Sequence, residues 1–115
     1  MILNSEAIKP FDFDGLSIRD FTATLNTSSS LAHIRVLPHT SHRRAWSKES
    51  DKYYYVISGQ LQFVLDAVEY TLKAGDVCIV SQGHKFSYAN TTETPVDLLL
   101  IHTPKFNIDA EIFDE

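Results

Sequence analysis

The sequence predicts a single all-β domain, and three observations carry this prediction. Short apolar or alternating runs recur roughly every eight to twelve positions, and clusters of turn residues separate them. Helical periodicity is hard to find anywhere in the chain. At 115 residues, the length is that of one domain with its own core. A small β-barrel or sandwich is the architecture that these features favour.

The predicted strands follow the apolar runs. We expect them at Ile2–Ile8, Leu16–Thr22, Leu31–Leu37, Tyr53–Ser58, Gln60–Leu65, Val68–Lys73, Val77–Val80, Lys85–Ala89 and Val96–His102. Gly15, Gly59 and Gly75 lie in turn sequences and are expected to take positive φ.

Two segments lack a clean strand pattern. Residues 38–51 show no alternation until their last third, which predicts a long loop over one mouth of the barrel, where function concentrates. Residues 104–115 are acidic with isolated aromatic side chains. They are expected to form a tail, or an edge strand that docks on another subunit.

Composition excludes several classes of function. The chain is 43% hydrophobic and 22% charged, as in ordinary globular proteins. Its net charge of −5, with Lys and Arg scattered, argues against nucleic acid as a partner. The longest apolar run, VDLLLI, is far shorter than the ~20 residues of a membrane span. With no signal-peptide pattern at the N-terminus, a cytoplasmic location is expected. Cys78 lies in the apolar run VCIV and is interpreted as a small buried hydrophobic residue.

Two segments carry a family resemblance. SDKYYYVISGQLQF at 50–63 and LKAGDVCIVSQGHKFSYAN at 72–90 resemble the two sequence motifs of the cupin family. The resemblance implies a single cupin-like jelly-roll β-barrel over residues 1–115, with its motif core at about 31–103. It also implies that the protein forms a homodimer, because cupins often form dimers by pairing or exchanging strands.

The first motif lacks the residues that bind metal in the family, which are typically three His and one Glu. With the motif glycine on Gly59, the Glu position falls on Lys52. The two His positions fall on Ala45 and Ser47, or on Trp46 and Lys48 under a shorter spacing.

The second motif keeps its scaffold residues, because Gly75, Gly83 and Asn90 match in register. Its metal-binding His position, however, is occupied by Phe86. Neither Ala nor Phe coordinates a metal, and a Lys ammonium is a donor only. The sequence therefore predicts a degenerate metal site and no cofactor.

An alternative metal site uses displaced histidines. His84, Phe86 and Tyr88 share one face of a strand that begins at His84, so that imidazole is expected to face the barrel interior. In this alternative, a divalent Fe, Mn, Ni or Zn ion is bound by His residues drawn from His84, His102, His39 and His42. His33 and His102 each have an even chance of facing inward.

A lining for a small-molecule pocket follows from the same alternation. Lys52, Tyr54 and Val56 share one face of their strand, while Tyr53 and Tyr55 share the other. The predicted ligand-binding residues are Ala45, Trp46, Ser47, Lys52, Tyr54, His84, Phe86, Tyr88 and His102. The competing interpretation is that the rings simply fill the barrel.

Lys52 also has two interpretations. In an apolar cavity its pKa would fall, so that it could act as a base or form a Schiff base. Alternatively, it is exposed or paired with a carboxylate such as Glu49 or Asp51, its neighbours in sequence.

The function predicted from sequence is a small-molecule-binding barrel, as a sensor or accessory protein. The alternative is an enzyme. Either a rearranged His set supports metal-dependent dioxygenase or isomerase chemistry, or His84, Tyr88 or Lys52 serves as acid and base in a metal-free epimerase or isomerase. In a third possibility the barrel is packed solid and acts through its surface.

Overall fold

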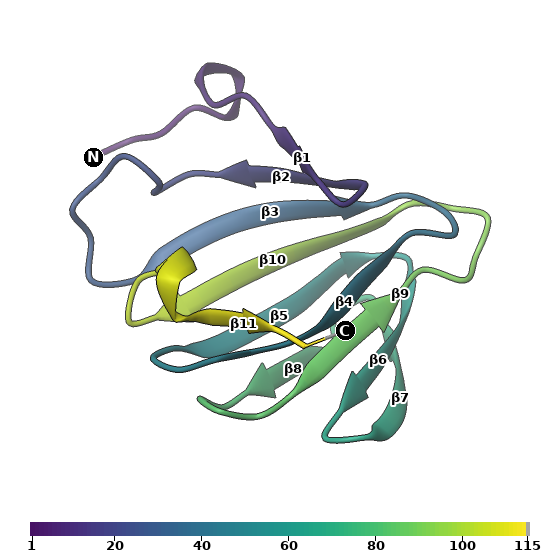
Figure 1. The fold of residues 1–115 in the computed structure, drawn as a ribbon. Helices are drawn as coiled ribbons and strands as arrows, with labels where there is room; N and C mark the ends of the chain where they lie inside the picture. The colour runs from purple at the N-terminus through teal and green to yellow at the C-terminus, as the bar shows by residue number, and fades with distance from the viewer. Residues whose placement is uncertain (115) are drawn as a thin grey trace.

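Two antiparallel sheets face each other in the computed structural model, which describes residues 1–114 (Figure 1). The first sheet has the spatial order β1 (Phe11–Phe13), β2 (Leu16–Asp20), β3 (Ser30–Val36), β10 (Val96–Thr103), β5 (Asp51–Ser58) and β8 (Val77–Val80). The second has the order β11 (Glu111–Phe113), β4 (Ser41–Ser47), β9 (Phe86–Ala89), β6 (Gln60–Leu65) and β7 (Val68–Lys73). The prediction of an all-β jelly-roll barrel is confirmed.

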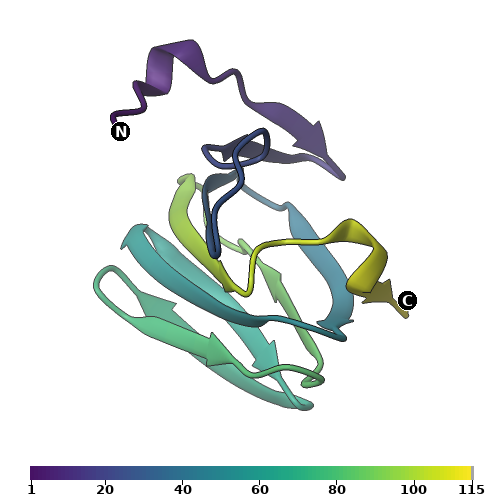
Figure 2. The ribbon, with the colours of Figure 1, turned by 90° about the vertical axis from the view of Figure 1, so that its left-hand side faces the viewer.

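Most of the predicted strands are present within about two residues of their expected bounds. The exception is the strand predicted at Ile2–Ile8, which is wrong. That segment contains a short 3₁₀ helix, η1 (Ser5–Ala7), and its apolar residues Met1 and Ile2 are almost fully exposed. The N-terminal segment stands clear of the two sheets in Figure 2, so it has no partner strand to pair with.

The long loop predicted over residues 38–51 is also wrong, because β4 occupies its centre and pairs with β9. His42 is opposite Tyr88 and Ala45 is opposite Phe86, so β4 has one extra residue between these pairs. Such a β-bulge shifts the alternation of side chains along the strand. His42 and Ala45 consequently both face the barrel interior, a pattern that a simple period of two does not reveal.

The C-terminal segment returns to the barrel. After a second 3₁₀ helix, η2 (Ile108–Ala110), strand β11 pairs with β4, with Glu111 opposite Ser47 and Phe113 opposite Ala45. It is thus the edge strand of the second sheet of its own chain, beside β4 in Figure 1. Docking of this segment on another subunit stays a prediction, as does the homodimer.

Alternation along the strands separates the core from the surface. On β5, the side chains of Lys52, Tyr54 and Val56 are buried, while Tyr55 and Ile57 on the opposite face are exposed, as predicted. The core cluster combines inward residues of both sheets: Leu16, Ile34, Val36, Ala45, Tyr54, Val56, Leu61, Phe63, Val80, Phe86, Tyr88, Val96, Leu98 and Leu100.

Four aromatic rings occupy the centre of this core. The rings of Tyr54, Phe63, Phe86 and Tyr88 lie with their centroids 5.4 to 6.4 Å apart. These separations are typical of favourable aromatic pairs, which stabilise a core beyond the burial of their area.

The motif residues that match the cupin pattern have structural roles. Asn90 is buried at the end of β9, where its amide donates to the carbonyl oxygens of Val36 (3.0 Å) and Thr94 (2.8 Å). Gly59, in the tight turn between β5 and β6, has a φ of +88°. Gly15 and Gly75 also have positive φ, as predicted. Within residues 1–114, no helix is long and apolar enough to cross a membrane.

Replacing Gly59 by Ala is expected to destabilise the fold more than replacing Gly75. Both glycines have φ near +90°, which costs a residue with a side chain about 1 kcal/mol or more. A Cβ at Gly59 would also lie 2.9 Å from the Pro95 carbonyl oxygen, whereas one at Gly75 meets nothing within 4 Å. Urea unfolding of Gly59→Ala should show a loss at least about 1 kcal/mol greater than that of Gly75→Ala. Equal losses would mean that the turn moves to relieve the clash.

Candidate functional site

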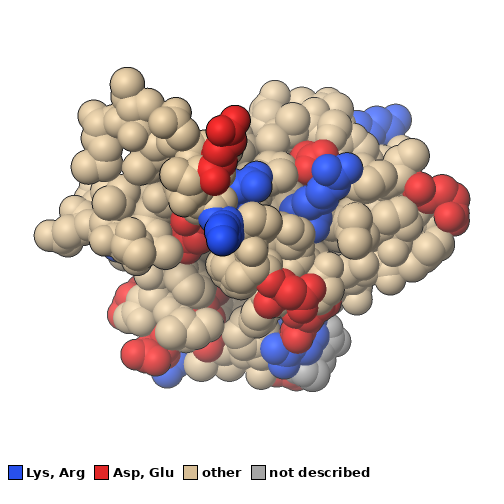
Figure 3. Space-filling view, turned by 90° about the horizontal axis from the view of Figure 1, so that it is seen from above, with Lys and Arg blue, Asp and Glu red and all other residues tan. Residues whose placement is uncertain are grey.

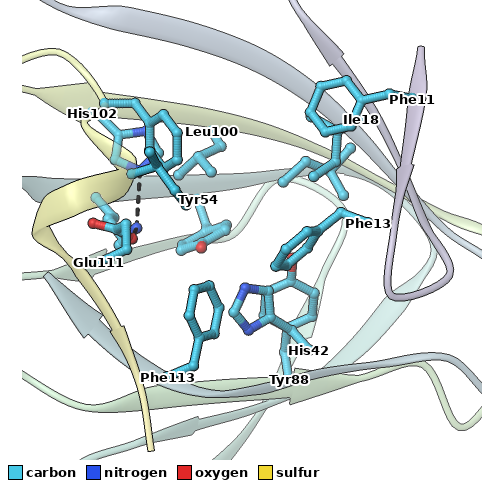
Figure 4. Close-up of a pocket in the computed structure, with 14 residues that line it drawn as sticks. Phe11, Phe13, Ile18, His42, Tyr54, Tyr88, Leu100, His102, Glu111 and Phe113 are labelled. Carbon is cyan, nitrogen blue, oxygen red and sulfur yellow. Dashed lines mark hydrogen bonds and ion pairs between the residues drawn. The ribbon is translucent and has the colours of Figure 1, made fainter.

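A cavity of about 180 Å³ lies between the two sheets (Figure 4). Its lining combines both sheets, the N-terminal hairpin and the C-terminal segment, through Phe11, Phe13, Ile18, Ile34, His42, Lys52, Tyr54, Tyr88, Leu100, His102, Phe106, Ile108, Glu111 and Phe113. Most of these residues are apolar or aromatic, and the few polar ones gather in two groups. This composition is typical of a small-molecule site.

The first polar group is centred on Lys52, whose side chain is buried. Lys52 and His102 are cross-strand neighbours on β5 and β10, and the ammonium donates to His102 Nε2 over 2.9 Å. The same ammonium forms an ion pair with Glu111 of β11, and both side chains are only 4% exposed. The Lys52 Nζ also lies 5.4 Å from the centroid of the Phe86 ring, a cation–π contact.

Burial lowers the pKa of both bases of this group. Desolvation lowers the pKa of Lys52, and the charge of Glu111 opposes that shift. Desolvation, followed by repulsion from Lys52, lowers the pKa of His102 to about 3. His102 is therefore neutral at pH 7, and its Nε2 is free to accept the Lys52 hydrogen bond.

The second polar group pairs His42 with Tyr88 across β4 and β9, with ring centroids 5.0 Å apart. His42 Nδ1 donates to the backbone carbonyl oxygen of Arg43, so the Nε2 of the neutral ring has no proton. Desolvation is the largest cause that lowers the His42 pKa to about 4. Phe13 and Phe113 flank the imidazole, with centroids 6.1 and 5.9 Å away.

Two polar atoms of this site have no hydrogen-bond partner among the described residues. They are the Tyr88 hydroxyl and Oε2 of Glu111, and both are buried. Burial raises the pKa of Tyr88, so its hydroxyl stays protonated and can donate, whereas a carboxylate oxygen can only accept. Because buried polar groups in folded proteins are almost always satisfied, these two atoms mark where a ligand would be held.

The structure brings part of the predicted lining together. Lys52, Tyr54, Tyr88 and His102 line the cavity, and His102 rather than His33 is the inward histidine. Figure 4 shows His102 and Glu111 on one side of the cavity, the His42–Tyr88 pair on another, and Tyr54 between them.

Other predicted lining residues lie outside the cavity. Ala45, Ser47 and Phe86 are buried in the barrel but belong to its packed core, and the Ser47 hydroxyl accepts from the Ser50 amide. Trp46 is half-buried on the opposite face of β4, across from Ile112 of β11.

The inward orientation predicted for His84 is wrong. The strand begins only at Phe86, and His84 lies in the preceding turn, exposed and paired with Asp66 at 2.5 Å. The side-chain alternation that would have turned it inward therefore never starts. His84 does not line the cavity, so its position does not support a role in acid–base chemistry there.

The residues at the metal-binding positions do not fit a metal. Ala45, Ser47, Lys52 and Phe86 occupy these positions. Nor do the displaced histidines converge, because His39 is exposed and pairs with Glu93, while His84 pairs with Asp66. Residues 1–114 contain no group of three or more His, Cys, Asp or Glu side chains arranged to hold a metal ion. Within the described residues, no three of His84, His102, His39 and His42, from which the alternative metal site would draw its ligands, lie together.

Sequence reasoning missed the part of the site contributed by the chain ends and by the bulge. The sequence pattern places His42 only in a loop or among metal ligands, and it places Glu111 and Phe113 in a tail or in an edge strand for another subunit. Lys52 was expected to pair, if at all, with Glu49 or Asp51, and its partner is Glu111 instead. The signal that could have found Glu111 is Lys52 itself. If Lys52 faces inward as a cation, a buried carboxylate is expected to pair with it, because an unpaired buried charge is costly.

The fold and the site define a double-sheeted β-barrel with an internal, largely apolar pocket. A family model described as the cupin domain matches residues 32–102, more than half of the chain. The chain belongs to the cupin family. No match was found among curated proteins.

Solved structures share the fold over nearly the whole chain. The nucleoside dehydratase Pac13 from Streptomyces has a TM-score of 0.87 at 20% identity, covering 100% of this chain and 91% of Pac13. A His-to-Gln variant of that protein with uridine has a TM-score of 0.86 at 20% identity, covering 99% and 90%. A sugar phosphate isomerase from Silicibacter pomeroyi has a TM-score of 0.77 at 21% identity, covering 90% and 75%. At sequence identities this low, the similarity to these structures establishes the fold alone.

Breaking the buried ion pair is expected to be costly. Lys52→Met leaves the Glu111 carboxylate buried without its cation, and a loss of about 3–5 kcal/mol in the free energy of unfolding is expected. The double variant Lys52→Met/Glu111→Leu should recover most of this loss, because no lone charge remains. Asp14→Asn, which breaks an exposed pair with Arg43, is the control and should cost at most about 1 kcal/mol. The free energies of unfolding are measured in urea. If the loss in the double variant equals the sum of the losses in the two single variants, Lys52 and Glu111 are not coupled.

Stability is expected to fall as the pH drops from about 6.5 toward 4. His42 and His102 have folded pKa values of about 4 and about 3, below their ordinary 6.5. In this window the unfolded chain binds protons that the folded chain does not, so acid favours unfolding. Melting temperatures at pH 7.5 and 5.0 should differ less in His42→Gln and His102→Gln than in the wild type. His39→Gln, which removes an exposed imidazole, is the control. An equal difference in melting temperature between the two pH values in all four proteins would contradict the destabilising role of His42 and His102.

Proposed function

We propose that this cupin binds a nucleoside or a similar ring-bearing polyhydroxylated molecule in the central cavity and catalyses acid–base elimination of water from it. The observation that carries the proposal is the His42–Tyr88 pair. A neutral imidazole with an unprotonated Nε2 lies beside a buried phenol that has no hydrogen-bond partner among residues 1–114, inside an apolar cavity. This arrangement combines a proton acceptor with a hydrogen-bond donor.

The two groups suit different parts of such a reaction. The His42 Nε2 takes a proton from carbon, most readily one acidified by a neighbouring carbonyl group. The Tyr88 phenol, whose pKa is raised, stays protonated and donates a hydrogen bond to a substrate oxygen. The imidazolium then returns its proton to the departing hydroxide. The C–H and C–O bonds break, a C=C bond forms, water leaves, and both residues regain their starting states.

The likeness to Pac13 supports the choice of ligand. Pac13 is a nucleoside dehydratase, and variants of it with His replaced by Gln or Tyr replaced by Phe were solved with uridine. The present cavity contains two histidines and two tyrosines among its lining residues. Aromatic rings around it, such as Phe13 and Phe113, suit the stacking of a planar base.

The alternative function is that of a sensor, which binds the ligand without converting it. Such a function needs the cavity but does not explain the proton acceptor at His42. Turnover separates the two functions. Incubation with nucleosides and hydroxycarbonyl sugars, followed by mass spectrometry, should reveal a product lighter by one water for an enzyme. Binding with no such product would instead favour the sensor.

Uridine is the first probe. Calorimetric titration should detect its binding to the wild type, and His42→Gln and Tyr88→Phe should each weaken it by about two- to tenfold, the value of one lost hydrogen bond. His39→Gln and Tyr70→Phe, which alter exposed residues of the same types, serve as matched controls. No binding at millimolar uridine, or equal affinities in all five proteins, would overturn the proposal.

A further inference from the structure

The cavity contains one cation, and its charge is already balanced. Lys52 and Glu111 form a buried ion pair, so their charges cancel within the lining. The other basic side chains of the lining, His42 and His102, are neutral at pH 7 because their pKa values are about 4 and about 3. The site therefore has no net charge to attract an anion.

The hydrogen-bonding capacity of Lys52 is also largely used. Its ammonium carries three N–H groups, of which one points to Glu111 and one to His102 Nε2. Its nitrogen also lies near the Phe86 ring. Glu111 is in the opposite situation, because its Oε2 is buried and makes no hydrogen bond to any residue among 1–114. On this side of the cavity, therefore, Glu111 Oε2 is left to accept a hydrogen bond from a donor group of the ligand.

A cation just outside the cavity is neutralised too. Arg43 lies over the outer side of the lining residue Phe113, 4.6 Å from the ring centroid, and its Nε donates to Asp14 over 2.9 Å. On the face seen in Figure 3, Lys and Arg side chains lie next to Asp and Glu side chains and form no continuous basic area.

We infer that the ligand is uncharged, lacks a phosphate group, and donates a hydrogen bond to Glu111, which acts as the residue that selects against anions. The inference rests on the proposed function. It restricts the class of ligand to free nucleosides and excludes nucleoside phosphates. A phosphate in the cavity would face a buried carboxylate with no unpaired cation, and such like-charge contact is strongly unfavourable. A hydroxyl or ring N–H would instead satisfy Glu111 Oε2.

The test compares uridine with uridine 5′-monophosphate and uridine 3′-monophosphate by calorimetric titration at pH 7.5. For the wild type, both phosphates should bind at least about tenfold more weakly than uridine. In Glu111→Gln, which removes the negative charge and keeps the shape, this discrimination should shrink at least about threefold. Glu93→Gln makes the same change at an exposed site and should leave it intact.

Each outcome has one meaning. Weaker phosphate binding by the wild type, relaxed in Glu111→Gln alone, supports the inference. A phosphate that binds the wild type as tightly as uridine overturns the inference and leaves nucleoside binding standing. Discrimination that survives in Glu111→Gln overturns the role of Glu111. Absence of binding by all three probes overturns the proposed function, and this inference with it. If Glu111→Gln fails to fold, Lys52→Met/Glu111→Leu, which leaves no lone buried charge, takes its place in the same comparison, and unchanged discrimination in that variant overturns the role of Glu111.

Discussion

The buried ion pair between Lys52 and Glu111 is the constraint on which the site depends. An ammonium inside a barrel is strongly favoured by an anion in contact, since a lone buried charge costs about 3–5 kcal/mol, a large part of the stability of a small domain. The anion comes from β11, the last strand of the chain, so the pair also holds the C-terminal segment against β4. That segment in turn supplies Phe113, which contacts His42 and forms part of the cavity lining.

The interior of this barrel shows how a family scaffold can be kept while its chemistry changes. The glycine turns and the buried Asn90 hold the sheets together. At the positions where the family motifs have a Glu and a His, Lys52 and Phe86 form a cation–π contact. In the proposed reaction, proton transfer and hydrogen bonding by His42 and Tyr88 supply the catalysis.

Much of the fold was predictable because the β-strand period is a local property. The strands at 51–58, 60–65 and 96–103 were predicted within about two residues, and on the first of them Lys52, Tyr54 and Val56 share the buried face, as expected. Prediction failed where the local pattern was misleading. Residues 2–8 are apolar yet have no neighbouring strand, and the bulge in β4 interrupts the alternation of residues 41–47. Lys52, Tyr54, Tyr88 and His102 were placed inside, because their strands were assigned in register.

By itself, the sequence determined the all-β jelly-roll barrel, the membership of the cupin family, and the alternation that puts Lys52, Tyr54 and Val56 on one face of β5. Those features depend on alternation and on residues close together in the chain. Only the tertiary structure decided which carboxylate pairs with Lys52, that His42 rather than His84 enters the cavity, and that a cavity remains between the sheets. These outcomes depend on contacts between β4, β5 and β11 and on how closely the rings pack, and neither property has a periodic signature in the sequence.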